Sequence, residues 1–423
     1  MGLKKALKII ESQKQIIESL EKRVKELEGL LKDKSKPSFI KEEVVHRHKK
    51  TGQKEGHVGI SRTTPEQIDE KKEMDTDTCQ HCESKLSEII EVRKRYVSDV
   101  PIVKAVTTEY TIYRRYCKQC RKVVEPFFPY ALPHARFGLR LMLLVLILKL
   151  DKRLPSKQIT SLLKMQYGLG ISDGEVYGML RQAAEAFGSY YTTLQEKIRN
   201  ALVKHSDETS WRENGENRWL WLFINREVAL YLIREKRSSK VPIAELGDQQ
   251  NKIVNSDRFS AYSQLAKKTG CLQQLCWAHI LRESERLAKL YPEACYVHKR
   301  LKYIYAKATS EKPPSVEKLL HWTGLIVDTR RYRIPRVYKF AKSICRVHGD
   351  NLFRFVGNPE VESTNNRAER GLRHAVVIRK ISNGSRSEQG SEITAKLLSV
   401  VQTAKMNSVN PMSFMMDVLQ KAK

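Results

Sequence analysis

The sequence predicts a multidomain α+β protein. Its 423 residues exceed what one hydrophobic core usually organises, so we expect about three or four folded units. Two neighbouring strand-like runs, residues 219–224 and 228–233, indicate a compact sheet, whereas residues 131–200 and 281–360 have mainly helical patterns. Two Cys-x-x-Cys pairs in the first third of the chain indicate a further, metal-held module.

The charge balance indicates a polyanionic partner. Lys and Arg number 77 against 48 Asp and Glu, a formal net charge of +29, which favours nucleic acid. The rival, a membrane, is disfavoured because the longest apolar run, residues 141–148, is too short to span a bilayer. No signal peptide is recognisable at the start, so we expect a soluble cytoplasmic protein with reduced cysteines.

Residues 1–35 carry an apolar heptad repeat. One position of the repeat holds Leu3, Ile10, Ile17, Val24 and Leu31, and the other holds Ala6, Gln13, Leu20 and Leu27. Branched residues at the first position with Leu at the second favour a parallel two-stranded coiled coil, hence a homodimer. The alternative is a single amphipathic helix packed on its own chain. Residues 36–75 are polar and basic, and we interpret them as a flexible linker.

Residues 76–130 contain the two cysteine pairs. Cys79 with Cys82, and Cys117 with Cys120, present four thiolates, which predict a closed structural zinc site. We expect a β-hairpin between the pairs, with residues 106–113 as one strand. The alternative, a redox role for one Cys-x-x-Cys pair, would not explain why the chain has a second pair. The other cysteines are expected to be small buried residues; they are Cys271, Cys276, Cys295 and Cys345.

A helix-turn-helix is predicted within residues 131–200. Residues 156–163 and 172–184 have helical patterns and are separated by a glycine-containing turn. Ser172, with Glu175 three residues later, forms a capping box at the start of the second helix. The pair suits a recognition helix in a DNA major groove, although two packed helices of this kind also occur in ordinary helical domains.

Three carboxylates at element ends form the candidate catalytic set. Asp207 and Asp257 follow strand-like runs, and Glu369 falls in the first turn of a helix expected to start near Asn366. Each acid alone could be a helix cap or a surface group. Together, in a strongly basic chain, they indicate a site that binds divalent metal ions.

Several motifs together resemble the DDE transposases of the insertion sequence 66 family. They are HSDETSW at 205–211, NSDRFSAY at 255–262, CWAHILR at 276–282, TNNRAER at 364–370, GHVG at 56–59 and RKIS at 379–382. With the heptads and the paired Cys-x-x-Cys motifs, the resemblance covers nearly the whole chain.

The resemblance implies an RNase H-like α/β catalytic core, residues 201–280 and 361–423, interrupted by a helical insertion at 281–360. Its catalytic acids would be Asp207, Asp257 and Glu369, holding Mg²⁺ or Mn²⁺, with Glu362 as the alternative third acid. Cys276 and His279 match a Cys-x-x-His signature after the second acid. The residues expected to contact DNA are His279, Arg282, Arg370, Arg373, Arg379 and Lys380.

The implied function is metal-dependent cleavage and strand transfer of double-stranded DNA, at the inverted repeats of a mobile element and at a target. Two other classes stay open. One is a DNA-binding regulator that uses the zinc module and the helix-turn-helix without catalysis. The other is a metal-dependent nuclease that cleaves but does not join strands.

Overall fold

A computed structural model describes most of the chain. The described residues are 11, 13, 15–21, 23–24, 64–408 and 410–421. The chain divides into two compact units, Met1–Val103 and Lys104–Lys423, and each is described by itself. None of the described helices is long and apolar enough to cross a membrane.

The first unit contains part of the heptad segment. Its described residues between 11 and 24 are helical, and Ile17, Leu20 and Val24 are each more than half exposed. The rest of the expected coiled coil, and linker residues 36–63, lie outside the described residues. From residue 64 to 103 the chain is almost entirely exposed and forms one isolated β-bridge, between Thr78 and Lys85.

The second unit opens with a short hairpin that differs from the expected one. Its strands are β1 (Arg115–Cys117) and β2 (Lys122–Val124), so they flank the second cysteine pair. The expectation of a strand at residues 106–113 was wrong, because these residues are exposed and form no strand. A strand needs a backbone partner, and here the tight Cys-x-x-Cys turn provides one only for its immediate neighbours.

Helices follow, as the apolar pattern predicted. They are α2 (Leu139–Leu146) continued by the π-helix η1 (Ile147–Asp151), then α3 (Ser156–Tyr167), α4 (Asp173–Ala186) and α5 (Gly188–Asn200). The capping box is confirmed, because Glu175 N donates to Ser172 Oγ at 3.2 Å and Ser172 N donates to the Glu175 carboxylate at 2.8 Å.

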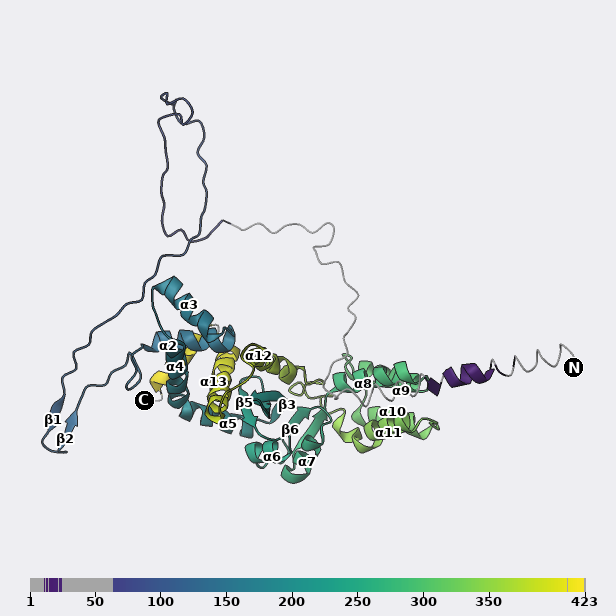
Figure 1. The fold of residues 1–423 in the computed structure, drawn as a ribbon. Helices are drawn as coiled ribbons and strands as arrows, with labels where there is room; N and C mark the ends of the chain where they lie inside the picture. The colour runs from purple at the N-terminus through teal and green to yellow at the C-terminus, as the bar shows by residue number, and fades with distance from the viewer. Residues whose placement is uncertain are drawn as a thin grey trace. The chain divides into compact units, whose positions relative to one another are not determined.

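A five-stranded sheet forms the centre of this unit (Figure 1). Its strands are β3 (Val203–Glu213), β4 (Glu216–Ile224), β5 (Ala229–Arg234), β6 (Ile253–Ser256) and β7 (Leu272–Leu275). Their order is β5-β4-β3-β6-β7; β3, β4 and β5 are antiparallel, whereas β6 and β7 run parallel to β3. The predicted strand-like runs 219–224 and 228–233 fall on β4 and β5, joined by a short turn.

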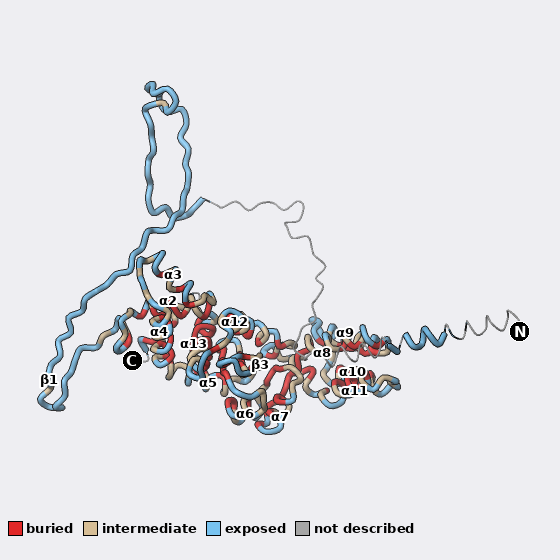
Figure 2. The backbone as a smooth tube through the Cα atoms, in the orientation of Figure 1, coloured by how far each residue is buried: buried red, intermediate tan, exposed pale blue. Residues whose placement is uncertain are grey.

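Helices cover both faces of the sheet, and the buried residues gather between them (Figure 2). One core joins the sheet to α2, α4, α12 (Asn366–Ser382), α13 (Glu388–Asn407) and α14 (Pro411–Lys421). The core on the other face joins it to α5, α6 (Lys240–Leu246) and α7 (Ser260–Thr269). The helical region before the sheet therefore shares its core with the sheet.

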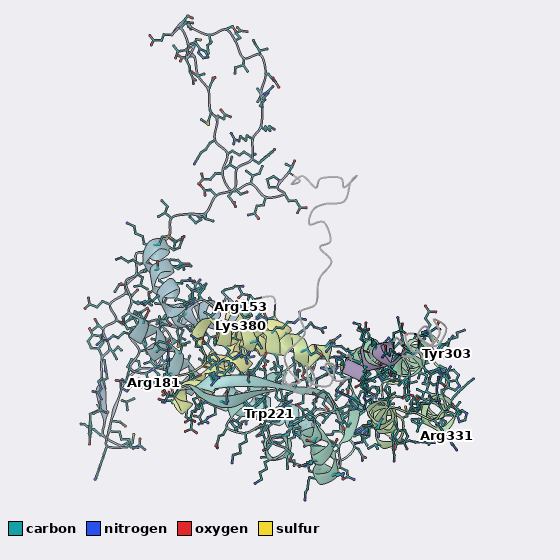
Figure 3. All side chains as sticks on the ribbon, turned by 45° about the vertical axis from the view of Figure 1, so that its right-hand side comes forward. Arg153, Arg181, Trp221, Tyr303, Arg331 and Lys380 are labelled. Atoms are coloured by element: carbon teal, nitrogen blue, oxygen red, sulfur yellow. The ribbon has the colours of Figure 1, made fainter. Side chains whose placement is uncertain are left out.

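An all-helical insertion separates β7 from α12. It comprises α8 (Trp277–Leu290), α9 (Ala294–Ala308), α10 (Val316–Asp328), α11 (Pro335–Lys342), the π-helix η2 (Ser343–Val347) and the 3-10 turn η3 (Gly349–Asn351). These helices surround a hydrophobic core of their own. Figure 3 labels Tyr303 and Arg331 on this insertion.

Candidate active site

Strand β3 directs Asp207 and Glu208 to opposite faces of the sheet. In the antiparallel ladder Asp207 pairs with Leu222 and Glu208 pairs with Trp221. Directly paired residues lie on the same face of a sheet. Leu222 belongs to the core beneath α12, and Trp221, labelled in Figure 3, belongs to the core beneath α7. Asp207 therefore faces α12, where Glu369 lies.

Gly371 brings α12 unusually close to the sheet at this point. A Cβ at Gly371 would meet Leu222 Cδ2 at 2.6 Å, so any side chain here would displace a buried leucine. Tyr231 Oη donates to the Gly371 carbonyl at 2.9 Å and ties the helix to β5. Since Leu222 pairs with Asp207, this close approach carries Glu369 toward Asp207.

Two buried asparagines fix the segment that leads into α12. Asn255, on β6, donates to the carbonyls of Glu362 at 2.6 Å and Thr364 at 3.2 Å. Asn365 donates through its side chain to the Ser206 carbonyl at 2.8 Å, and its Oδ1 lies 3.1 Å from His205 Nδ1. The start of the helix is thus bound to β3 and β6, the strands that carry the other two acids.

The three candidate acids interact electrostatically. Asp257 directly follows β6, and its Oδ1 accepts a hydrogen bond from Phe259 N at 2.8 Å. Burial raises the pKa of Asp207 well above its usual range, and the negative charges of Glu208, Asp257 and Glu369 raise it further. Negative charges near a buried carboxyl group disfavour its ionisation. A cation would relieve that repulsion.

Glu362, the alternative third acid, is already paired. Its Oε1 accepts hydrogen bonds from Arg367 Nε at 2.9 Å and Nη2 at 2.5 Å. A carboxylate neutralised by a forked guanidinium contact has less need of a metal ion.

Glu369 instead lies beside the Cys-x-x-His signature. Its Oε1 is 3.6 Å from His279 Nδ1, and Cys276 Sγ lies in the same cluster, in which the candidate ligand atoms are within 4.8 Å of one another. Both Glu369 Oε1 and His279 Nδ1 are buried, and neither has a hydrogen-bond partner among the described residues.

A buried network on the opposite face was missed from the sequence. Glu208 accepts two hydrogen bonds from Arg237, at 2.9 and 2.6 Å, and one from Tyr262 Oη at 2.5 Å. Ser206 Oγ donates to the same tyrosine oxygen at 3.1 Å. Arg237 also stacks over the ring of Phe259, 4.0 Å from its centroid. The sequence of β3 is polar at most positions, so no local pattern distinguished Glu208.

Four of the expected DNA-contacting cations are exposed, namely Arg282, Arg370, Arg373 and Lys380, the last labelled in Figure 3. Arg379 differs. Its guanidinium donates to the Ser210 hydroxyl at 2.5 Å and to the Ser210 carbonyl, and it is partly buried. Arg379 therefore ties α12 to β3 through its Nη1 atom.

The two cysteine pairs, one in each unit, share one backbone feature. The residue after the second cysteine has a positive φ in both cases, 57° at Glu83 and 52° at Arg121. Cys117 and Cys120 have sulfur atoms 3.0 Å apart. In the first turn Cys79 N donates to the Ser84 carbonyl and Glu83 N donates to the Cys79 carbonyl. Such tight turns expose two thiols on one side, as metal knuckles require.

Residues 134–393, more than half of the chain, match a protein family described as "Transposase IS66 family". Three similar proteins come from Sinorhizobium fredii (strain NBRC 101917 / NGR234). Uncharacterized protein y4hP is 20% identical over 81% of this chain and 70% of its own length. Uncharacterized protein y4jD is 25% identical over 45% and 41%, respectively, and uncharacterized protein y4qI is 26% identical over 40% and 35%.

Proposed function

The chain belongs to the IS66 family of transposases, and from that premise we propose that it cuts and joins DNA strands with Asp207, Asp257 and Glu369 as its catalytic acids. The observation that carries the proposal is the electrostatic coupling of the three acids. They come from β3, from the end of β6 and from α12, yet the pKa of Asp207 is raised first by burial, then by the charge of the adjacent Glu208, and also by the charges of Asp257 and Glu369. Such coupling at a junction of three elements is typical of a functional site.

The strand order supports an RNase H-like core. Three antiparallel strands, extended on the β3 side by two strands parallel to β3, place the first acid on the central strand and the second at the end of its parallel neighbour. The third acid then follows the helical insertion, as the family resemblance implied.

The donor set fits Mg²⁺ or Mn²⁺. Hard divalent ions prefer carboxylate oxygens, and Asp207, Asp257 and Glu369 would supply them. When bound, such ions activate an attacking oxygen and stabilise the leaving oxygen in phosphoryl transfer. The chain's own residues hold the acids in position: Asn365 and Asn255 fix the start of α12, and Phe259 N orients Asp257.

Exposed cations would bind the DNA backbone. Arg370 and Arg373 lie on α12 close to Glu369 in sequence, and Arg282 lies on α8, close to His279. On α4, the candidate recognition helix, Tyr177 and Arg181 are exposed, whereas Val176, Met179 and Leu180 are buried; Figure 3 labels Arg181. These contacts would position DNA without choosing its sequence, except where α4 reaches base edges.

We assign a structural zinc ion to the two cysteine pairs and dimerisation to the heptad segment. The positive φ that follows each cysteine pair supports the first, and the exposed Ile17, Leu20 and Val24 support the second. Elemental analysis showing no zinc in a DNA-binding preparation would contradict the zinc assignment. A dimer that survives Ile17→Lys with Val24→Lys in sedimentation would contradict the coiled coil.

The decisive experiment compares Glu369→Gln with Glu362→Gln in a plasmid assay that scores joined strands and simple nicks separately. Glu369→Gln should abolish both products and retain DNA binding, since it removes a metal-binding charge and keeps the side-chain shape. Glu362→Gln should be much milder. The reverse result would transfer the role to Glu362, nicks without joining would indicate a nuclease, and a parent protein that binds but never cuts would indicate a regulator.

A further inference from the structure

The cluster at the start of α8 has a chemistry that magnesium does not use. Cys276, His279 and Glu369 offer one thiol, one imidazole nitrogen and one carboxylate oxygen, all within 4.8 Å of one another. Mg²⁺ takes oxygen ligands, whereas sulfur with imidazole selects zinc and related transition metals. The ligand atoms of this cluster therefore suit a different ion from the one expected at Asp207, Asp257 and Glu369.

Two atoms of the cluster lack hydrogen bonds to the described part of the chain, although they lie at ion-pair distance from each other, 3.6 Å. Glu369 Oε1 and His279 Nδ1 are buried without hydrogen bonds among the described residues. A buried polar atom left unpaired usually costs about 1–3 kcal/mol, so native structures seldom leave two of them facing each other. An ion between them would satisfy both.

The local geometry suits a tetrahedral ion. Cys276 is the N-cap of α8 and His279 lies in its first turn, a Cys-x-x-His spacing that directs both side chains to one side. The separation of His279 Nδ1 and Glu369 Oε1, 3.6 Å, is close to the roughly 3.4 Å expected between two ligands that are each about 2.0–2.1 Å from a tetrahedral zinc. Asn365 N donates to Cys276 Sγ at 3.1 Å and so helps to hold the sulfur in position beside His279 and Glu369.

We propose that Cys276, His279 and Glu369 bind a zinc-class divalent ion, separate from the four-cysteine site. Cys276 and His279 stand at the start of the helical insertion and Glu369 just after it, so the ion closes the base of the insertion and fixes α12 against α8. Glu369 has two carboxylate oxygens and can serve this ion and the acid cluster together. The ion site does not depend on the proposed DNA cleavage.

The test counts zinc in the full-length protein. Parent, Cys276→Ser and His279→Gln proteins are dialysed against the same zinc buffer and analysed for bound metal. Both variants should hold one zinc fewer per chain than the parent. Cys271→Ser is the matched control, because Cys271 is a buried free cysteine that precedes β7, at the opposite end of the strand from Cys276, and is not in the cluster. It should hold as much zinc as the parent.

Cobalt substitution provides a second readout. Co²⁺ bound here should add a thiolate charge-transfer absorption that Cys276→Ser loses and Cys271→Ser retains. Equal zinc counts and equal cobalt spectra in parent, Cys276→Ser and His279→Gln would overturn the proposal. Because the readout is a difference of one ion, it holds whether or not the four cysteines bind zinc. A parent that cuts no DNA but shows this difference would refute only the proposed function.

Discussion

Asp207 and Glu208 are consecutive acids on one strand; burial and the charge of Asp257 raise the pKa of both, but only Glu208 is paired with a guanidinium and a hydroxyl. Glu208 has both carboxylate oxygens satisfied, one by Arg237 and the other by Tyr262. Asp207 accepts a backbone hydrogen bond from Glu208 N at 2.9 Å and interacts with two further negative acids, Asp257 and Glu369. The alternation of a β-strand separates the two environments by a single residue.

The comparison distinguishes a structural carboxylate from a carboxylate that is a candidate metal ligand. A carboxylate paired with a guanidinium and a hydroxyl stabilises the fold around it, and adding a metal would break those bonds. A carboxylate held among other carboxylates costs stability, a cost that proteins retain at sites where a cation is used. Four predictions test this comparison.

The largest effect is expected for Asp207→Asn. If Asp207 is a metal ligand, the loss of its charge should lower DNA cleavage by roughly a thousandfold or more, because ligands of one metal site act as a unit. Glu208→Gln at the adjacent position should retain substantial cleavage at a temperature where it is folded. A cleavage assay in Mg²⁺ checks both; an active Asp207→Asn protein would mean that the wrong acid was assigned.

The elements that carry the candidate acids could be predicted from the sequence because each has a recognisable local pattern. Asp207 and Asp257 occur with buried strand runs, and Glu369 occurs one turn into a helix whose start at Asn366 was predicted. The capping box at Ser172 was equally readable, since its chemistry is contained within four residues.

The long-range contacts that hold these elements together could not be predicted from the sequence. Asn365 reaches Ser206 across 159 positions of sequence, and Tyr231 reaches Gly371 across 140. Neither residue carries a local pattern that specifies its distant partner, because tertiary packing decides it. The misplaced hairpin strand at residues 106–113 has the converse cause: an apolar alternation was present, but no backbone partner.

The second prediction concerns stability on the Glu208 face. Glu208→Gln should lower the free energy of unfolding by about 2–3 kcal/mol, because Arg237 loses a charged acceptor in a largely buried site. Urea denaturation measures this. Glu216→Gln is the matched control, since that strand acid is mostly exposed in its pair with Arg218 and should change stability little. Equal losses would remove the distinction between the two acids.

The third prediction uses pH on the Asp207 face. Burial lowers the pKa of His205 to about 4, below its ordinary 6.5. Between pH 6.5 and pH 4 the unfolded chain binds more protons at His205 than the folded chain does. The contribution of neutral His205 to the free energy of unfolding is therefore complete above pH 6.5 and is lost as the pH falls toward 4. From pH 7 to pH 5 the loss from His205 should reach about 2 kcal/mol.

His205→Asn separates this residue from other titrating groups. Urea denaturation of parent and variant should show that the parent loses about 2 kcal/mol more of its free energy of unfolding than the variant does between pH 7 and pH 5. Protonation would also disturb the contact between His205 and Asn365, which fixes the start of α12. A parent and variant with parallel pH profiles from pH 7 to pH 5 would show that His205 is not buried in its neutral form.

The smallest expected effect is that of Tyr262→Phe. The tyrosine hydroxyl donates to Glu208 and accepts from Ser206, while its ring is buried against Trp221, 6.4 Å between centroids. Phenylalanine keeps the ring and removes both hydrogen bonds, so the free energy of unfolding should fall by about 1 kcal/mol. Arg237 continues to neutralise Glu208, and DNA cleavage below the unfolding temperature should stay within a fewfold of the parent. A cleavage loss as large as that of Asp207→Asn would place the Tyr262 network in the reaction and erase the difference between the two faces of β3.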